Sequence, residues 1–529
     1  MTLPGRLAGA RVTSHGTRVA VTPHHLASRA AIEILDGGGN AADAAVAANA
    51  TLGVVAPETC GIGGDLFALI QVPGRETPAA LNSSGHAGAG ARAEMIRGEG
   101  LTRIPVESPY AVTVPGCVDG WEAILEEYGS LPLSRVLETP VALAESGFPA
   151  SPQLARALEM LAGDLRPQPA SAGLYSDGTP PAAGALVTRP TLAATLRAIA
   201  AAGREAFYAG DVGDGIVSAT AGVIDRDDLA RRQADWIDPI PVDVLGWTGW
   251  TIPPNSQGYL TLAAAWLFEN LDPPHDPTHP RFTHAAIEAY RAMAWERDRL
   301  VCDDRFSPID PDDLLDTGRL EERLSRIDLD TRTDWPTPPP APGGTAFLCV
   351  RDDQGMGISL IQSNYHGIGS RIGVGDHGFF LHDRGSGFTL EPGHPNEIAP
   401  GKRPLHTLSP TLWTLDGSLQ MLLGTRGGDF QPQTLLQMVT YMRWAGLDGA
   451  TAQLQPRWTT AEWRTNDPGV VFEPHLDTGV VEALREWGHH PRPAPGWMPG
   501  WGPVSVITGH GDGVVGAADP RVAATAALS

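Results

Sequence analysis

A proline- and glycine-rich stretch, DWPTPPPAPGGT at residues 334–345, divides the sequence into two parts of different texture. Proline fixes its own φ angle and lacks a backbone N–H, so such a run cannot continue a helix or a central strand. Before it, apolar residues recur every three or four positions, as in helices; after it, short apolar runs are bounded by Gly, Asp or Asn, as in strands. We therefore expect one domain in which an exposed linker joins a helix-rich part to a strand-rich part.

The strongest local patterns support this division. Residues 26–53 are alanine-rich and interrupted by the glycines at 37–39, which predicts helix, turn and helix. Further helices are expected at 120–129, 152–163, 189–203 and 283–300. Strands are expected at 346–350, 357–363, 418–424 and 503–509. Composition and periodicity alone support a mixed α/β fold.

Length and charge restrict the class of partner. A chain of 529 residues exceeds the size at which one core stops growing, so two domains or one large two-sheet domain are expected. The 38 basic and 61 acidic residues give a net charge of −23 that is spread along the chain, which disfavours nucleic acid and anionic membranes as partners. No stretch has the apolar length of a signal peptide or a membrane span. We expect a cytoplasmic protein with a small-molecule substrate.

No metal or cofactor is assigned from the sequence. Four widely separated cysteines fit neither a disulfide framework nor a thiolate zinc site. His275, His279 and His284 lack an HExxH frame, and His284 is expected on a helix that follows a proline-rich loop. The acidic run IDRDDLARR, 224–232, predicts a helix N-terminus rather than a calcium loop. The sequence also lacks a phosphate-binding GxxxxGK[ST] motif and the GxSxG elbow of α/β-type serine hydrolases.

Thr345 is the candidate nucleophile, because it follows two glycines at the start of an expected strand. A hydroxyl beside a peptide bond can attack the preceding carbonyl, and Gly344 hinders that attack little. Cleavage would give Thr345 a free α-amine, whose pKa of about 8 suits a general base. Taken alone, the pattern is more often a turn followed by a strand-start threonine. Local reasoning leaves both interpretations open.

The order of many longer segments resembles the gamma-glutamyltransferase (gamma-glutamyl transpeptidase) family over nearly the whole chain. Before the linker the matching segments are 21–70, 114–133, 207–230, 252–262 and 283–299, and after it 345–370, 400–413 and 422–434. The resemblance implies an α+β fold of the N-terminal-nucleophile hydrolase type, a four-layer αββα sandwich. It also implies autocleavage into a large segment, 1–344, and a small one, 345–529, which remain together as a heterodimer of one domain. Whether heterodimers pair further is left open.

Individual positions carry the family's catalytic roles. Thr345 falls on the nucleophile that is released when the Gly344–Thr345 bond is cut. Ser363 falls on the hydroxyl residue that bonds the nucleophile's side chain, with Ser in place of the more usual Thr. Gly427 and Gly428 fall on the pair whose backbone N–H groups hold the oxyanion, for which a simple glycine turn is the alternative.

The substrate pocket departs from the glutathione-cleaving members of the family. Ser84 stands where those members have the arginine that binds the α-carboxylate, and Gly387 where an acidic residue binds the α-amine. Tyr365 replaces an expected Asn, and His406 with Thr407 replaces a Ser-Ser pair. Both groups that hold a glutamate head-group are missing, so we expect a rebuilt pocket.

Arg384 is the expected anchor for a substrate carboxylate, with Arg371 and His86 as weaker candidates. A solvated surface charge is an equal alternative for Arg384 and the preferred one for Arg371 and His86. The variant pattern resembles the branch that includes oxamate amidohydrolase. We expect hydrolysis of a small amide that bears a carboxylate. A true glutathione hydrolase or transferase, and a catalytically silent binding protein of the same fold, are the alternatives.

Overall fold

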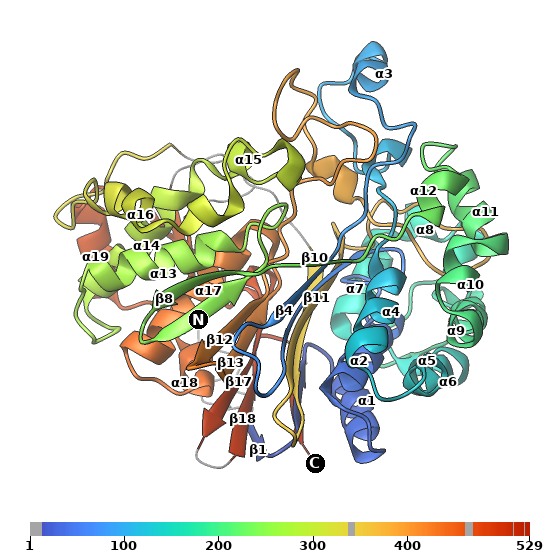
Figure 1. The fold of residues 1–529 in the computed structure, drawn as a ribbon, viewed down its shortest axis with the longest axis horizontal. Coiled ribbons are helices and arrows are strands. Elements are labelled where there is room, and N and C mark those ends of the chain that lie inside the picture. The colour runs from blue at the N-terminus through green and yellow to red at the C-terminus, as the bar shows by residue number, and fades with distance from the viewer. Residues whose placement is uncertain (1–12, 337–343, 461–468, 511–512, 523, 529) are drawn as a thin grey trace.

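The computed structural model describes residues 13–336, 344–460, 469–510, 513–522 and 524–528. Within them two seven-stranded antiparallel sheets lie face to face, and helices cover the outer face of each (Figure 1). The expected four-layer αββα sandwich is therefore confirmed. None of the described helices is long and apolar enough to cross a lipid bilayer.

The first sheet combines strands from both sides of the linker. Its order is β19 (Thr525–Leu528), β2 (Val19–Thr22), β10 (Gly344–Arg351), β11 (Gly357–Tyr365), β3 (Asp65–Gln71), β4 (Ala79–Ser83) and β7 (Asp235–Ile237). The central pair, β10 and β11, comes from the part after the linker and lies between β2 and β3 from the part before it. The two parts thus share one hydrogen-bonded sheet.

The second sheet is built in the same mixed way. Its order is β1 (Thr13–Gly16), β18 (Gly513–Ala518), β17 (Val504–His510), β13 (Ser418–Thr425), β12 (Thr411–Leu415), β9 (Trp247–Thr251) and β8 (Ile240–Val244). Two small sheets lie outside the sandwich, β5 (Phe148–Pro149) with β6 (Leu186–Val187), and β14 (Trp458–Thr459) with β15 (Val470–Phe472) and β16 (Pro491–Pro493).

Helices formed by residues 25–230 lie on the side of the first sheet, drawn in blue to green in Figure 1. They are α1 (His25–Asp36), α2 (Ala41–Val55), α4 (Cys117–Tyr128), α5 (Leu133–Val136), α6 (Glu138–Ser146), α7 (Pro152–Met160), α8 (Ala162–Leu165), α9 (Pro190–Ala202), α10 (Arg204–Tyr208), α11 (Gly210–Ala219) and α12 (Arg226–Ala230). On the side of the second sheet are α13 (Tyr259–Asn270), α14 (Pro280–Ala294), α15 (Arg297–Leu300), α16 (Thr317–Leu324), α17 (Gln431–Val439), α18 (Gly449–Leu454) and α19 (Thr478–Glu486). Helix α3 (Ala93–Gly98) lies apart from both layers.

Side-chain alternation along β10 shows how the layers pack. Ala346, Leu348 and Val350 face the core shared with α1, α2 and α4. Phe347 and Cys349 face the core between the two sheets. Because successive side chains of a strand point to opposite faces, a strand buried on both sides reads as a continuous apolar run. The position of β10 at the centre of the sandwich therefore buries Thr345, its second residue.

Most sequence predictions of helices and strands are confirmed. Residues 26–53 form α1 and α2, and the second helix begins with a capping box in which Asn40 and Asp43 each accept from the other's backbone. The run 224–232 starts α12 in the same way, with Asp225 as the N-cap. The single helix expected at 283–300 is wrong, because it is divided into α14 and α15.

The helix breaks next to Glu296, which precedes α15 with a ψ of −2°. Its carboxylate accepts hydrogen bonds from Arg319 and Arg323 of α16. Tertiary ion pairing at this point outweighs the local helical pattern.

The expected exposed linker is only partly correct. Residues 337–343 lie outside the described part of the chain. Trp335 is 2% exposed and packs in the core beneath the second sheet, because burying an indole ring stabilises the fold strongly. Gly344 and Thr345 already belong to β10, and Thr345 is 1% exposed.

Candidate active site at the start of strand β10

Thr345 lies at an irregularity in the pairing of β10 with β11. Gly344 pairs with Tyr365 and Ala346 with Gln362, so Thr345 faces two residues of β11. Such a bulge turns the neighbouring side chains away from the regular alternation. Tyr365 closes the bulge with a φ of 74°, a left-handed conformation that is unusual for a bulky residue. Backbone strain of this kind is concentrated at functional sites.

The Ser363 hydroxyl lies at the centre of the bulge. It donates to the Gly344 carbonyl oxygen at 2.5 Å and accepts from the Thr345 hydroxyl at 3.2 Å. It also accepts from the backbone N–H of Tyr365 at 2.8 Å. Since a hydroxyl has one hydrogen, donation to Gly344 leaves its oxygen free to receive the hydrogen of Thr345. One side chain thus polarises the carbonyl before Thr345 and orients the Thr345 hydroxyl.

Gly427 and Gly428 follow β13, a strand that contacts β10 across the core between the sheets. Both have positive φ angles, 126° and 58°, which glycine adopts without a steric penalty. The carbonyl oxygen of Gly428 accepts from Gln257 Nε2 at 3.0 Å, and the same nitrogen donates to the Thr407 carbonyl at 3.0 Å. Gln257 therefore fixes the glycine turn to the loop that carries Thr407.

Arg297 holds Gln257 in that position. Its Nη1 donates to Gln257 Oε1 at 3.3 Å and forms an ion pair with Asp429, the residue after the glycine pair. Sequence reasoning did not single out these three side chains. They are far apart in the chain and form no motif, so only the folded structure brings them together.

Arg384 is fully buried, and its hydrogen-bond acceptors among the described residues are neutral. Nη2 donates to Thr407 Oγ1 at 3.2 Å and Nη1 to the Leu405 carbonyl at 3.4 Å. The guanidinium carbon lies 3.4 Å from the centre of the Tyr365 ring. Nε has no hydrogen-bond partner among the described residues, and burial lowers the pKa of Arg384. The carboxylates of Asp65, Asp383 and Asp429 offset part of this effect, but none of them is hydrogen-bonded to Arg384 among the described residues. A buried cation without a hydrogen-bonded carboxylate is costly, so this place can receive an anion.

Tyr365 connects the two groups of residues. Its backbone N–H bonds to Ser363, and its ring lies against Arg384. Burial raises the pKa of Tyr365 to about 12, so the phenol remains neutral. The sequence-predicted residues Thr345, Ser363, Tyr365, Arg384 and Thr407 therefore form one connected set.

His406 and Ser84 have their hydrogen-bonding side-chain atoms turned to other partners. The ring of His406 donates from Nε2 to Asp65 Oδ2 at 3.0 Å, and burial lowers its pKa to about 3, so the imidazole is neutral. Ser84 donates to Asn82 at 2.7 Å and accepts from Asn255 at 3.1 Å, with no exposed surface. Both residues brace the loops around Arg384, and among the described residues neither forms a hydrogen bond with Thr345.

Arg371 and His86 lie outside the connected set of residues around Thr345 and Arg384. Arg371 forms ion pairs at 2.8 Å with Glu107 and with Asp164, both more than half exposed. His86 Nδ1 bonds to Gln233 at 2.8 Å. Of the three candidate anion anchors, the structure joins only Arg384 to the set around Thr345.

Comparison with known proteins gives a consistent result. The model of the family Gamma-glutamyltranspeptidase matches residues 27–529. The chain is 34% identical over 518 residues to the glutathione hydrolase-like YwrD proenzyme of Bacillus subtilis, covering 96% of this chain and 97% of that protein. It is 33% identical over 522 residues to the oxamate amidohydrolase proenzyme of Klebsiella pneumoniae, covering 96% and 98%. The structure of a cephalosporin acylase from Bacillus halodurans superimposes with a TM-score of 0.92 at 29% identity, covering 100% and 98%.

Proposed function

The chain belongs to the gamma-glutamyltranspeptidase family, and we propose that it is a precursor that cuts itself between Gly344 and Thr345 and then hydrolyses a small amide through an acyl-threonine. One observation carries the proposal. The Ser363 hydroxyl bonds both the Thr345 hydroxyl and the Gly344 carbonyl. Attacking group and attacked bond are therefore held by a single side chain.

Autocleavage follows from this arrangement. Thr345 Oγ attacks the carbonyl carbon of Gly344 and gives its proton to Ser363, whose own hydrogen passes to the carbonyl oxygen. The Gly344 C–N bond then breaks as the proton on the former carbonyl oxygen passes to the nitrogen, which becomes the α-amine of Thr345. Gly344 is now esterified to Thr345 Oγ, and water hydrolyses that ester to a carboxylate and a free hydroxyl.

Turnover uses the same threonine. The new α-amine, with a pKa of about 8 in its unperturbed form, removes the proton from Thr345 Oγ as the oxygen attacks the substrate amide. The N–H groups of Gly427 and Gly428 stabilise the oxyanion, and the leaving amine takes the proton from the α-amine. Water then releases the acyl group. Residues 1–344 and 345–529 remain joined as a heterodimer through the first sheet.

The proposed substrate bears a carboxylate that pairs with Arg384. Gly387, the position of the amine-binding acid in glutathione-cleaving relatives, adjoins that guanidinium: a Cβ there would lie 3.9 Å from Arg384 Nη1. The charge at this place is thus the reverse of what an α-amine needs. The oxamate amidohydrolase relative supports a short substrate of this kind.

A substrate comparison tests the proposal. Oxamate, a γ-glutamyl anilide and glutathione are incubated with the purified protein, and ammonia, aniline and glutamate release are measured. We expect oxamate or another short carboxylate-bearing amide to give the highest kcat/KM. A higher kcat/KM for the γ-glutamyl anilide would favour a glutathione hydrolase, and an uncut chain without turnover would favour a silent binding protein.

A further inference from the structure

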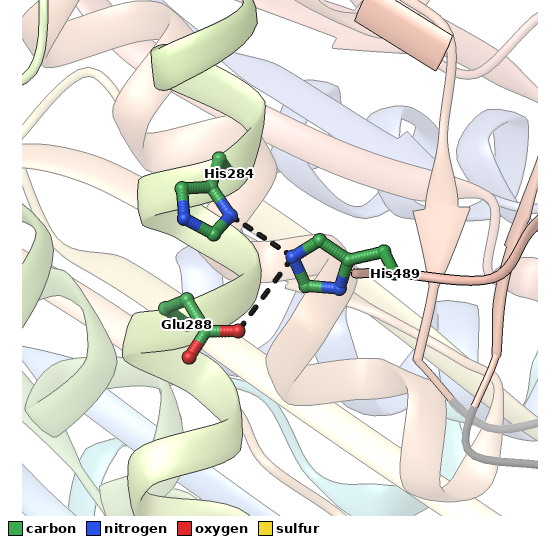
Figure 2. Close-up of side chains that lie close together, drawn as sticks. All are labelled: His284, Glu288 and His489. Atoms are coloured by element: carbon green, nitrogen blue, oxygen red, sulfur yellow. Dashed lines mark hydrogen bonds and ion pairs between the residues drawn. The ribbon is translucent and has the colours of Figure 1, made fainter. Parts of the chain in front are cut away.

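Three side chains that can ligate metals meet in the core beneath the second sheet, away from Thr345. His284 and Glu288 lie one turn apart on α14, and His489 lies in the segment that follows α19 (Figure 2). All three are buried. No sequence motif connects the three residues, because His489 is far from the other two in the chain.

The ligand atoms have separations suited to a small divalent ion. His284 Nδ1 lies 2.9 Å from His489 Nε2, and His489 Nε2 lies 3.7 Å from Glu288 Oε1. All three atoms lie within 4.8 Å of one another. A tetrahedral ion with ligand distances of about 2.0–2.1 Å places its ligand atoms about 3.3–3.4 Å apart. These two separations lie on either side of that value, so the two histidine nitrogens would move slightly apart and Glu288 slightly inward to hold an ion.

The surroundings hold each of these ligands in place. The His284 ring stacks on Trp487 with ring centres 4.7 Å apart. Glu288 Oε2 accepts from the backbone N–H of Thr333 at 3.0 Å, and the backbone N–H of His489 donates to the Leu484 carbonyl at 2.9 Å. A hydrogen bond to the carboxylate, as Thr333 makes to Glu288, orients a metal ligand and is a regular part of such sites.

Arg291 is the strongest argument against a cation here. Its Nη1 donates to Glu288 Oε1 at 2.7 Å, so the carboxylate is already paired. The same nitrogen bonds the Thr333 carbonyl at 3.0 Å, but Nη2 has no hydrogen-bond partner among the described residues. Arg291 is buried, and its hydrogen bonds to Glu288 and Thr333 are both made by Nη1. A bound ion would weaken this ion pair, and Arg291 would oppose binding in turn.

We propose that His284, Glu288 and His489 form a site for a divalent transition metal, of which zinc matches two imidazoles and one carboxylate best. His489 keeps its proton on Nδ1 in the bound form, so its Nε2 and the Nδ1 of His284 each offer a lone pair. The ion would connect α14, which precedes Thr345, to a segment that follows it. Through Glu288 and Thr333 it would also anchor the approach to the linker.

Metal binding by the purified full-length protein tests the proposal, and the test does not depend on turnover. The protein, free of any histidine tag, is treated with EDTA, dialysed and titrated with Zn²⁺ and with Co²⁺. We expect one equivalent to bind, a visible cobalt spectrum of tetrahedral intensity, and a higher Tm with zinc than with EDTA. His489→Gln and Glu288→Gln should each weaken binding at least about tenfold, whereas the control His275→Gln, at an exposed histidine, should not change it.

The variant Arg291→Met tests the proposal through a gain of zinc affinity, which an unfolded protein would not show. Because it removes an opposing positive charge, it should tighten zinc binding about tenfold or more. The proposal is overturned if the wild-type protein binds no stoichiometric zinc, even where Arg291→Met does. It is equally overturned if His489→Gln and Glu288→Gln bind as the wild type does, since the ion would then lie elsewhere.

Discussion

The two parts of the candidate active site are held by different means. At the start of β10, Thr345 and Ser363 are positioned by the backbone pairing of two central strands and by one bulge. Around Arg384 the positions are set by side chains from separate loops, through Thr407 and Tyr365. The difference explains how a family can keep one reaction and change its substrate. Residues that are positioned by strand pairing, such as Thr345, depend little on the identity of their neighbours' side chains. A pocket that is formed by side chains, such as the one around Arg384, changes its shape and charge when a few of them are substituted.

Thr345→Ala should have the largest effect, because it removes the nucleophile of both reactions. We expect no cleavage at the linker and a loss of turnover of at least about 10⁴-fold, measured by gel electrophoresis and by product release. Thr345→Ser keeps a hydroxyl and should still process, although more slowly. Cleavage of the Thr345→Ala chain between Gly344 and Ala at position 345 would contradict this account.

Arg384→Met should lower substrate turnover without affecting autocleavage. Losing one partner of a buried charge pair costs about 2–5 kcal/mol, so kcat/KM for a carboxylate-bearing amide should fall by about 30- to 4,000-fold. Processing should remain complete, because among the described residues Arg384 donates hydrogen bonds to Leu405 and Thr407 and not to Thr345 or Gly344. Arg371→Met, at a surface ion pair, is the matched control and should leave kcat/KM unchanged. Equal kcat/KM in both variants would mean that Arg384 binds no substrate.

Ser363→Ala should slow autocleavage without changing substrate preference. It removes the hydrogen bond to the Gly344 carbonyl and the partner of Thr345, a loss of about 1–3 kcal/mol, so processing should slow about 5- to 150-fold. The order of preference among substrates should not change. Ser363→Thr restores a hydroxyl and should restore most of the rate. A changed substrate preference with normal processing would reverse the roles that we assign to the two regions.

A smaller effect should appear in the pH dependence of stability. Burial lowers the pKa of His406 to about 3 and of His86 to about 4, below the unfolded value of 6.5. Between about pH 6.5 and pH 4 the unfolded chain therefore binds more protons than the folded one, so stability falls as the pH falls. The free energy of unfolding should drop by up to about 1.4 kcal/mol per pH unit for each such histidine.

The measurement is urea denaturation at several pH values and constant ionic strength. His406→Gln should reduce the acid sensitivity, and His275→Gln, at an exposed ring, should not. An identical slope in all three proteins would show that His406 is not held neutral in the fold.

The sequence predicts the residues around Thr345 and Ser363 more completely than those around Arg384. Gly344, Thr345 and Ser363 are close in the chain and lie in strands with clear apolar patterns, so their meeting follows from one hairpin. Gln257 and Arg297 reach the site from distant segments and carry no motif. His406 could be placed in the right loop, but not the direction of its ring, which depends on Asp65 in β3.

The central claim is that the Gly344–Thr345 bond is cut, and the most direct test is the intact mass of the purified protein combined with N-terminal sequencing. The account predicts two fragments, residues 1–344 and 345–529, the second beginning Thr-Ala-Phe-Leu-Cys. A single uncut chain, or a second fragment that begins at any other residue, would contradict it.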